Sequence, residues 1–200
     1  MPLTVDYYYA AQSPWAYLGH ERLRAMCRNH GARIALRPVD LGEIFPQSGG
    51  LPLAKRAPQR QSYRLIELRR FSEHTGVPLN IQPRHFPVPG NPASLLMIAV
   101  DQARGIEIAM DFTLAVFRAL WVQERDIASD DTLAALLAEC GLPADLLAAS
   151  RADAPKAAYA AYTAEAMAAE VYGSPTYVIQ GERFWGQDRL DFVERRLAKG

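Results

Sequence analysis

The first residue that could do chemistry is Ser13, in the stretch AAQSPWAYLGHERL over residues 10–23. It precedes Pro14 directly after a strand-like run, and serine followed by proline is a typical helix start. A helix N-terminus carries a partial positive charge and unpaired N–H groups, so it favours a thiolate beside it. A serine hydroxyl cannot exchange disulfides, but it can donate a hydrogen bond to the sulfur of a bound thiol. Ser13 is therefore either a helix cap alone or the group that holds a thiolate near neutral pH.

A second set of polar groups lies near the C-terminus, in GSPTYVIQGERFWGQDRL. Pro175 opens a strand, and the segment 185–188 joins a short strand to the last helix. This segment offers main-chain N–H groups, a polar side chain in Gln187 and an acid in Asp188. From the residues alone, it is equally a strand end followed by a helix cap, with Asp188 facing the helix dipole.

The cysteines and histidines indicate neither redox nor metal chemistry. Cys27 and Cys140 are far apart and form no CxxC motif, which leaves neither a dithiol pair nor a zinc site. We expect both cysteines to pack on helical stripes. His20, His30 and His74 have no metal-binding spacing, and we expect them at the surface or at helix ends. The sequence therefore predicts no metal site.

Composition argues against several classes of partner. The chain has 22 basic and 22 acidic residues, so its net charge of zero gives no attraction for nucleic acid or an anionic membrane. The N-terminus MPLTVDYYY has neither the basic nor the apolar region of a secretory signal. No window reaches about 18 consecutive apolar residues, the length of a membrane span. We therefore expect a cytoplasmic protein with reduced cysteines.

The elements that must position these groups begin with a strand–helix–strand unit. LTVDYYY predicts a buried strand, the helix from Pro14 ends at Gly31, and ARIALRPVDL predicts a second strand. The next stretch, GEIFPQSGGLPLAKRAPQRQ, is rich in proline and glycine and predicts a loop. SYRLIELRRFSEHTG predicts an amphipathic helix that ends at Gly76. The prolines of VPLNIQPRHFPVPGNP predict an irregular segment after it.

The rest of the chain divides into a helical block and an α/β end. Residues 93–167 are almost wholly helical in pattern, and the strands TYVI and FW then lead into a terminal helix. This order predicts an α/β, thioredoxin-like βαβ…ββα fold with an all-helical insertion between the halves. We expect a single unit, with the thioredoxin-like part at about 1–42 and 172–200 and the insertion at about 55–171.

Three stretches, taken in order, are similar to those of one family. SPWAYLGHERL, ELRRFSEHTGVPLNIQPRHFPV and GSPTYVIQGERFWGQDRL resemble the 2-hydroxychromene-2-carboxylate isomerase family. Its members are related to the kappa-class glutathione transferases and to the disulfide-forming DsbA proteins. The resemblance covers essentially the whole chain. It implies glutathione as the cofactor, catalysis by the glutathione thiolate, and a homodimer.

The resemblance also implies where glutathione binds. Ser13 would hold the thiol, and the backbone of Ser174 would pair with the cysteinyl unit. The segment 185–188 would bind the γ-glutamyl end, with Gln187 toward its carboxylate and Asp188 toward its amino group. Serine at position 174 departs from the valine of many relatives, although a main-chain contact survives that change. The implied cofactor-binding residues are Ser13, Ser174, Pro175, Trp185, Gly186, Gln187 and Asp188.

A flat aromatic substrate with carboxylate groups would need apolar walls and cations. Arg60 falls near a basic position of the relatives, and His85 falls where some of them carry a substrate-facing tyrosine. The candidate substrate residues are Trp15, Tyr17, Lys55, Arg60, His85 and Phe86.

The lead hypothesis is a glutathione-dependent isomerase that acts on an aromatic enol-pyruvate, a small-molecule substrate. Two alternatives stay open: a kappa-type glutathione transferase or peroxidase, and a non-catalytic thioredoxin-fold binding domain. A dithiol oxidoreductase is excluded at this site, because residues 13–16 read Ser-Pro-Trp-Ala without a cysteine. A thiol-conjugation assay tests the first alternative, and a thermal shift with glutathione tests the second.

Overall fold

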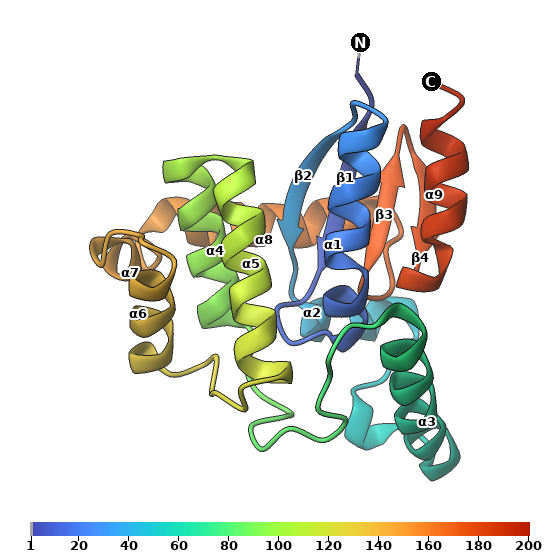
Figure 1. Cartoon of the computed structure of the whole chain (residues 1–200), viewed down its shortest axis with the longest axis horizontal. Helices are drawn as coiled ribbons and strands as arrows, with labels where there is room; N and C mark the ends of the chain where they lie inside the picture. Colours follow the sequence, from blue (N-terminus) through green and yellow to red (C-terminus); the bar gives the residue numbers. More distant parts are fainter. Residues whose placement is uncertain (1) are drawn as a thin grey trace.

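A four-stranded sheet forms the centre of the fold in the computed structural model, which describes residues 2–200 (Figure 1). The strand order is β2-β1-β3-β4. β1 (Thr4–Tyr9) pairs in parallel with β2 (Arg33–Pro38) and antiparallel with β3 (Thr176–Ile179). β4 (Glu182–Trp185) pairs antiparallel with β3 at the sheet edge. The predicted α/β class and the βαβ…ββα order are confirmed.

Helices cover both faces of this sheet. α1 (Pro14–Asn29) and α9 (Leu190–Leu197) lie on one face and contact each other, and α8 (Asp153–Ala168) crosses behind the other face (Figure 1). The Asp40 N–H donates to Thr163 Oγ1 at 3.0 Å, which ties the end of β2 to α8. α1 follows β1 directly, so its N-terminus opens at one end of the sheet.

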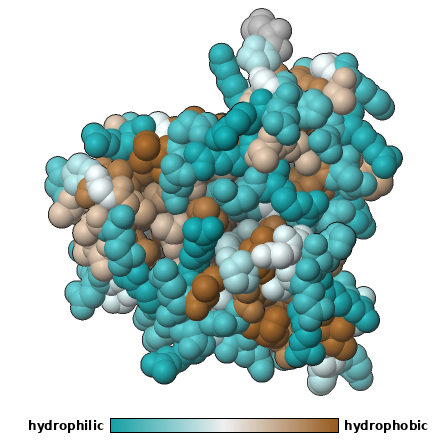
Figure 2. Space-filling model, viewed as in Figure 1, coloured by the Kyte–Doolittle hydropathy of each residue, from teal (hydrophilic) through white to brown (hydrophobic). Residues whose placement is uncertain are grey.

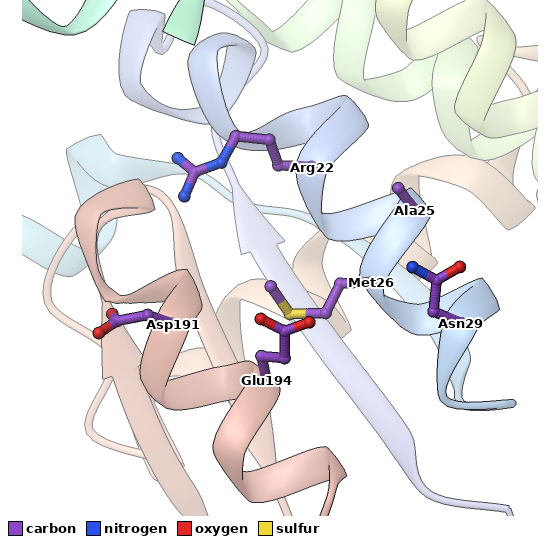
Figure 3. A pocket seen from close by; sticks show the side chains of 6 residues that line it. All are labelled: Arg22, Ala25, Met26, Asn29, Asp191 and Glu194. Atoms are coloured by element: carbon purple, nitrogen blue, oxygen red, sulfur yellow. The ribbon is translucent and has the colours of Figure 1, made fainter. Parts of the chain in front are cut away.

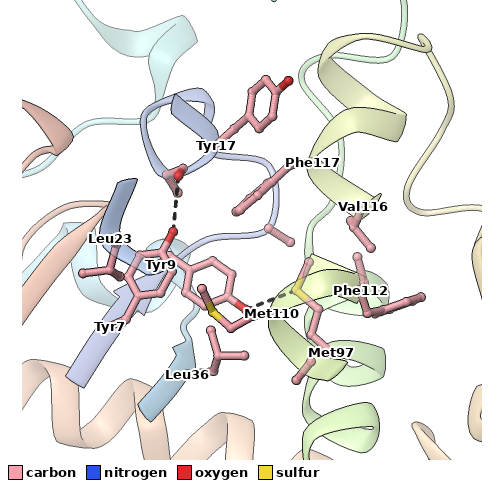
Figure 4. Close-up of a cluster of buried hydrophobic side chains, with 14 of the residues drawn as sticks. Tyr7, Tyr9, Tyr17, Leu23, Leu36, Met97, Met110, Phe112, Val116 and Phe117 are labelled. Atoms are coloured by element: carbon pink, nitrogen blue, oxygen red, sulfur yellow. Dashed lines mark hydrogen bonds between the residues drawn. The ribbon is translucent and has the colours of Figure 1, made fainter. Parts of the chain in front are cut away.

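Aromatic residues of β1 fill the core between the sheet and the neighbouring helices. Tyr7 stacks on Tyr9 with ring centroids 4.5 Å apart and on Tyr177 of β3 at 5.5 Å. Figure 4 shows Tyr7 and Tyr9 on the strand that faces Phe117. The Tyr7 hydroxyl donates to the carbonyl of Ala16 at 3.3 Å. The core strand thereby supports the first turn of α1.

Four helices form most of the predicted helical block. α4 (Asn91–Arg104) packs along α5 (Ile106–Trp121), and α6 (Asp130–Glu139) and α7 (Asp145–Ala149) lie beyond them in Figure 1. Gly105 separates α4 from α5 with φ of 83°, a conformation that glycine adopts readily. The helical character of the block and its break near Gly105 are confirmed.

The loop predicted after β2 is wrong in part, because it contains helical segments. α2 (Leu41–Ser48) and the 3₁₀ turn η1 (Leu53–Lys55) lie within it, and α3 (Pro58–Thr75) begins in it. Asp40 caps α2 by accepting a hydrogen bond from the Gly42 N–H at 2.7 Å. Proline is favoured at the first position of a helix and glycine just beyond its end. The residues that indicated a loop therefore mark helix boundaries here.

The end of α3 and the irregular segment after it are confirmed. Gly76 ends α3 with φ of 70°, in the left-handed region. Residues 77–90 contain neither helix nor strand. Figure 1 shows them crossing the molecule below the start of α1, between α3 and α5.

Two side chains lie where the sequence did not predict them. His20 is fully buried, because α5 covers α1 and brings Phe117 to a ring distance of 5.4 Å. His20 Nε2 lies 3.0 Å from the carbonyl of Met110, and burial lowers the pKa of His20 to about 4. Cys140 is exposed because it lies at the C-terminal end of α6, whereas Cys27 is buried as predicted.

The surface is mostly hydrophilic in the view of Figure 2, with hydrophobic residues exposed around α2 and α3. Leu51, Tyr63 and Ile66 are each about half exposed in that region. Within residues 2–200, no helix is both long and apolar enough to span a bilayer.

Candidate active site

Ser13 lies at the N-cap position of α1, where it has an extended backbone with φ of −81° and ψ of 117°. Its Oγ accepts a hydrogen bond from the Ala16 N–H at 3.2 Å, and Pro14 takes the first helical position. The predicted cap is therefore confirmed. Only 7% of Ser13 is exposed, so its hydroxyl lies in a largely desolvated position at the positive end of the helix dipole.

The segment before β3 meets Ser13 directly. The Ser174–Pro175 peptide bond is cis, and Ser13 Oγ donates to the Ser174 carbonyl at 3.3 Å. Ser174 Oγ in turn accepts a hydrogen bond from the Ala10 N–H at 2.9 Å. The serine at position 174 thus has a structural use, because it fastens this segment to the chain between β1 and α1.

The segment 185–188 is attached to the same place. The Gly186 N–H donates to the Pro175 carbonyl at 2.9 Å, and Gly186 has φ of 100°. A 3₁₀ turn, η2 (Gln187–Arg189), then leads into α9. The N–H groups of Gln187 and Asp188 occupy the first two positions of this turn, where a helix has no internal acceptor.

The side chains of Gln187 and Asp188 face different surroundings. Gln187 is 1% exposed, and its Oε1 accepts a hydrogen bond from Arg22 Nη1 at 2.9 Å. Its buried Nε2 has no acceptor within the described residues. Asp188 is exposed and accepts a hydrogen bond from Arg189 Nη1 at 2.7 Å. The side-chain oxygen of Gln187 is therefore already bonded to Arg22 of α1, whereas the Asp188 carboxylate is accessible to solvent.

Arg22 was not predicted, since nothing in the local sequence relates it to Gln187. Figure 3 shows it among the residues that line a pocket between α1 and α9. The residues that line this pocket are Arg22, Ala25, Met26, Asn29, Asp191 and Glu194. None of the predicted site residues lines it, so this pocket is separate from the Ser13 site.

The two predicted aromatic walls on α1 differ in exposure. Trp15 is half-buried, with its ring in an edge contact with Phe71 of α3 at 5.8 Å. Tyr17 is only 3% exposed, and its hydroxyl donates to the Pro78 carbonyl at 3.0 Å. Trp15 therefore lies at the boundary between α1 and α3, whereas Tyr17 belongs mainly to the core.

The remaining predicted substrate residues lie on α3 and its neighbouring segments. Lys55 of η1 and Arg60 of α3 are exposed, and His85 and Phe86 are half-buried in the segment 77–90. Phe86 packs against the ring of Trp121 at a centroid distance of 4.9 Å. No hydrogen bond within the described residues joins any of these four side chains to Ser13 or Ser174.

Sequence reasoning missed Arg64, a half-buried residue of α3. Its guanidinium carbon lies 5.0 Å from the ring centroid of Phe86. Burial, together with the nearby Arg56, lowers the pKa of Arg64 to about 10. A usable signal was present, because Arg64 lies four residues before Leu68 and seven before Phe71, on the same helix face.

Comparisons with known proteins identify the family to which this fold belongs. Residues 4–198 match the model of the DSBA-like thioredoxin domain. A protein named 2-hydroxychromene-2-carboxylate isomerase from Sphingobium xenophagum is 29% identical over 98% of this chain and 99% of its own. One of the same name from Pseudomonas putida is 29% identical over 98% of this chain and 95% of its own.

The fold has a solved counterpart as well. A structure of 2-hydroxychromene-2-carboxylate isomerase superposes with a TM-score of 0.82 and 24% identity, over 98% of this chain and 95% of that chain. The resemblance seen in the sequence motifs is thus confirmed across the full length. Because the family model covers nearly every residue, the chain belongs to the DsbA-like thioredoxin domain family.

Proposed function

We propose that this chain is a glutathione-dependent isomerase of the 2-hydroxychromene-2-carboxylate type. Relatives that carry this enzyme name over their full length support the isomerase activity. The observation that carries the proposal is the position of Ser13, a buried hydroxyl at a helix N-terminus without cysteine, in contact with Ser174. A helix start that favours a thiolate, but that supplies none itself, fits a thiol brought by a ligand.

The main chain beside Ser13 fits the cysteinyl unit of glutathione. The Ser174 N–H donates to no acceptor within the described residues, and the Ser174 carbonyl accepts one hydrogen bond, from Ser13. A carbonyl oxygen has two lone pairs, so a second donor can bind there. Ser174 therefore offers one donor and one acceptor, which is what an antiparallel contact with a peptide needs.

The turn after β4 fits the γ-glutamyl end. The N–H groups of Gln187 and Asp188 are the donors for a carboxylate, since they begin η2 without internal acceptors. The Asp188 carboxylate is the partner for an ammonium group. Its ion pair with Arg189 is exposed, and such pairs contribute only about 0–1 kcal/mol, so a ligand can replace it. The Gln187 side chain contributes by holding the turn rather than by contacting the ligand.

Ser13 can supply a hydrogen bond to the sulfur at little cost. Its present bond to the Ser174 carbonyl is long, at 3.3 Å, and one hydroxyl rotation redirects the proton. The bond that Ser13 Oγ accepts from the Ala16 N–H is unaffected by that rotation, so the hydroxyl stays in place. The hydroxyl and the helix N-terminus together favour the thiolate over the thiol.

The chemistry requires no redox partner. When bound, glutathione supplies a thiolate that adds reversibly to a conjugated double bond, so that rotation about a single bond precedes elimination. The protein holds the thiolate through Ser13 and restricts the substrate on the side of α3, where Trp15 and Phe71 are in contact. Donors near the substrate carbonyl would stabilise the charge that develops there.

Turnover of 2-hydroxychromene-2-carboxylate, followed by absorbance, tests this proposal. We expect isomerisation with glutathione and none without it. S-methylglutathione is the matched control, because it keeps the peptide and lacks the thiol; it should inhibit and not replace glutathione. Isomerisation that proceeds without glutathione would contradict the mechanism. Accumulation of a conjugate with 1-chloro-2,4-dinitrobenzene, without isomerisation, would favour the transferase.

The proposal includes a small-molecule substrate, a cytoplasmic location and a homodimer. Exposed Cys140 is consistent with a reducing compartment, since it has no disulfide partner. Sedimentation equilibrium of the full chain gives the oligomeric state, and a monomer at micromolar concentration would remove the homodimer from the proposal.

A further inference from the structure

Three arginines gather where α3 begins. Arg60 and Arg64 are one helical turn apart on α3, and Arg56 immediately precedes this helix. Arg56 and Arg64 are half-buried, whereas Arg60 is exposed. Burial is the main cause that lowers the pKa of Arg56 and of Arg64; the nearby charge of Arg60 lowers that of Arg56 further, and the charge of Arg56 lowers that of Arg64. Arg56 thus repels Arg64, and Arg60 repels Arg56.

No carboxylate of the described chain neutralises the two half-buried arginines. Neither Arg56 nor Arg64 takes part in an ion pair, whereas Arg70, farther along α3, pairs with Glu67 at 2.7 Å. Arg56 Nε donates only to the main-chain carbonyl of Leu51, at 2.8 Å. Partial burial removes water from a guanidinium, and an anionic partner compensates for that loss. Two half-buried arginines without an anionic partner are therefore suited to binding an anion.

Each of these two guanidinium groups lies beside an aromatic ring. The Arg64 carbon lies 5.0 Å from the Phe86 ring centroid, and Phe86 is backed by Trp121 at 4.9 Å. The Arg56 carbon lies 6.0 Å from the ring centroid of Phe45. These cation–π contacts hold the charged groups at apolar surfaces. A bound anion would therefore meet guanidinium donors beside aromatic rings.

The cluster lies on the side of α3 that faces the candidate active site. Arg64, Leu68 and Phe71 share one face of the helix; Leu68 is fully buried, and Phe71 contacts Trp15 next to the helix start of Ser13. Figure 1 shows α3 and the segment 77–90 below the start of α1. Arg64 therefore lies on the same face of α3 as Phe71, the residue that contacts Trp15 near the start of α1.

We propose that Arg56 and Arg64 form a carboxylate-binding site at the α3 end of the active site. The proposal rests on the function proposed above, which requires two carboxylate-bearing ligands. A planar carboxylate matches the paired donors of a guanidinium, and the aromatic rings suit the apolar group attached to it. Phe86 accordingly acts by positioning Arg64. The carboxylate belongs either to the aromatic substrate or to the glycine end of glutathione.

Calorimetric titration of the full chain distinguishes these two sources. One arm uses trans-cinnamate, a planar aryl carboxylate, and its uncharged amide; the other uses glutathione and its glycine ethyl ester. The variants are Arg64→Met, which keeps the packing on Phe86, and Arg64→Lys, which keeps the charge. Arg69→Met is the matched control, because Arg69 is an exposed residue of the same helix.

We expect Arg64→Met to raise one dissociation constant about tenfold, as for loss of a charged hydrogen bond, with smaller effects for Arg64→Lys and none for Arg69→Met. Weakened cinnamate binding with unchanged glutathione binding assigns the site to the substrate. Weakened glutathione binding, with no further effect on the ester, assigns it to the glycine carboxylate. Equal constants in wild type and Arg64→Met, or no binding of either anion by wild type, overturn the proposal.

In these titrations, the carboxylate site and the proposed glutathione mechanism can fail separately. If cinnamate binding depends on Arg64 while glutathione does not bind at all, the carboxylate site stands and the glutathione mechanism fails. If glutathione binds and supports turnover while Arg64→Met changes neither titration, the mechanism stands and the carboxylate site fails.

Discussion

The two sides of the candidate site are held in different ways. On the thiol side, main-chain and serine hydrogen bonds join Ser13, Ser174 and Gly186 to the core of the fold. On the α3 side, Arg56 and Arg64 are half-buried beside aromatic rings and have no carboxylate partner in the described chain. On the thiol side, the fold holds the site in place and leaves main-chain donors free for a ligand, whereas on the α3 side two positive charges have no ion-pair partner in the described chain.

From this difference we predict that substitutions on the two sides will have different effects. Changes on the thiol side should alter stability and cofactor binding together, since the same hydrogen bonds serve both. Changes on the α3 side should alter ligand binding at little cost in stability. The first of the following four cases concerns the buried core that supports α1, and the other three test this contrast.

The largest effect should come from His20, which is buried between α1 and α5. Burial lowers its pKa to about 4, from 6.5 in an unfolded chain. As the pH falls below 6.5, the unfolded chain takes up a proton that the folded chain does not accept until about pH 4. The stability contributed by neutral His20 is therefore present above pH 6.5 and falls by roughly 3 kcal/mol toward pH 4.

Urea unfolding at pH 7 and at about pH 4 measures this loss. His20→Gln should lose less stability than wild type between these two pH values, because glutamine does not titrate. His74→Gln is the control, since His74 is exposed at the end of α3. An equal pH-dependent loss in wild type and His20→Gln would show that other groups account for it.

Asp188→Ala should have the next largest effect, on glutathione binding. The loss of a charge-assisted contact with the ligand ammonium removes roughly 1.5–3 kcal/mol, which raises the dissociation constant about tenfold or more. Calorimetric titration with glutathione measures it, and Arg189→Ala is the control, because it removes only the exposed partner of Asp188. An unchanged titration for Asp188→Ala would exclude this contact.

Arg22→Met should have a smaller effect on the same titration. It removes the hydrogen bond to Gln187 Oε1 and leaves a buried amide unpaired, which costs about 1 kcal/mol of stability or more. We expect the glutathione dissociation constant to rise about threefold, with turnover at saturating glutathione preserved, because Arg22 acts only through the turn. Arg28 is an exposed residue of the same helix, so Arg28→Met should change neither the stability nor the glutathione dissociation constant. Loss of turnover at saturation would assign Arg22 a direct role.

The smallest effect is expected for the stability of Arg64→Met. Methionine fills the same space over Phe86 without a half-buried charge, so the free energy of unfolding should stay within about 0.5 kcal/mol of wild type or increase. Thermal unfolding without ligand measures this. A clear decrease in the melting temperature would mean that Arg64 is a structural group, and the contrast between the two sides would fail.

The sequence predicted the thiol side more completely than the α3 side for a physical reason. Ser13 followed by Pro14 is a local helix signal, and the cap needs only the neighbouring Ala16. The contact between Arg22 and Gln187 joins residues 165 positions apart, so no local pattern indicates it. The α/β order could be predicted because each element has its own pattern, even though their pairing is long-range.

The α3 side was predicted less well because proline and glycine occur both in loops and at helix boundaries. Proline and glycine predicted a loop around Pro46 and Gly49, but the Asp40 cap and the burial of Ile44 stabilise α2 instead. The orientation of α3 decides which arginine faces inward. Sequence comparison favoured exposed Arg60, whereas the helix turns Arg64 toward Phe86.

The most direct test of the central claim is the ultraviolet absorbance of the glutathione thiolate, titrated against pH in complex with wild type, Ser13→Ala and Ser13→Gly. Glycine caps a helix nearly as well as serine, whereas alanine costs about 1 kcal/mol of stability, so the pair separates capping from catalysis. If Ser13 holds the thiolate, both variants shift the thiolate titration to higher pH by a similar amount and lower turnover together. If the three titration curves superimpose, Ser13 is only a helix cap, and the proposed mechanism is contradicted.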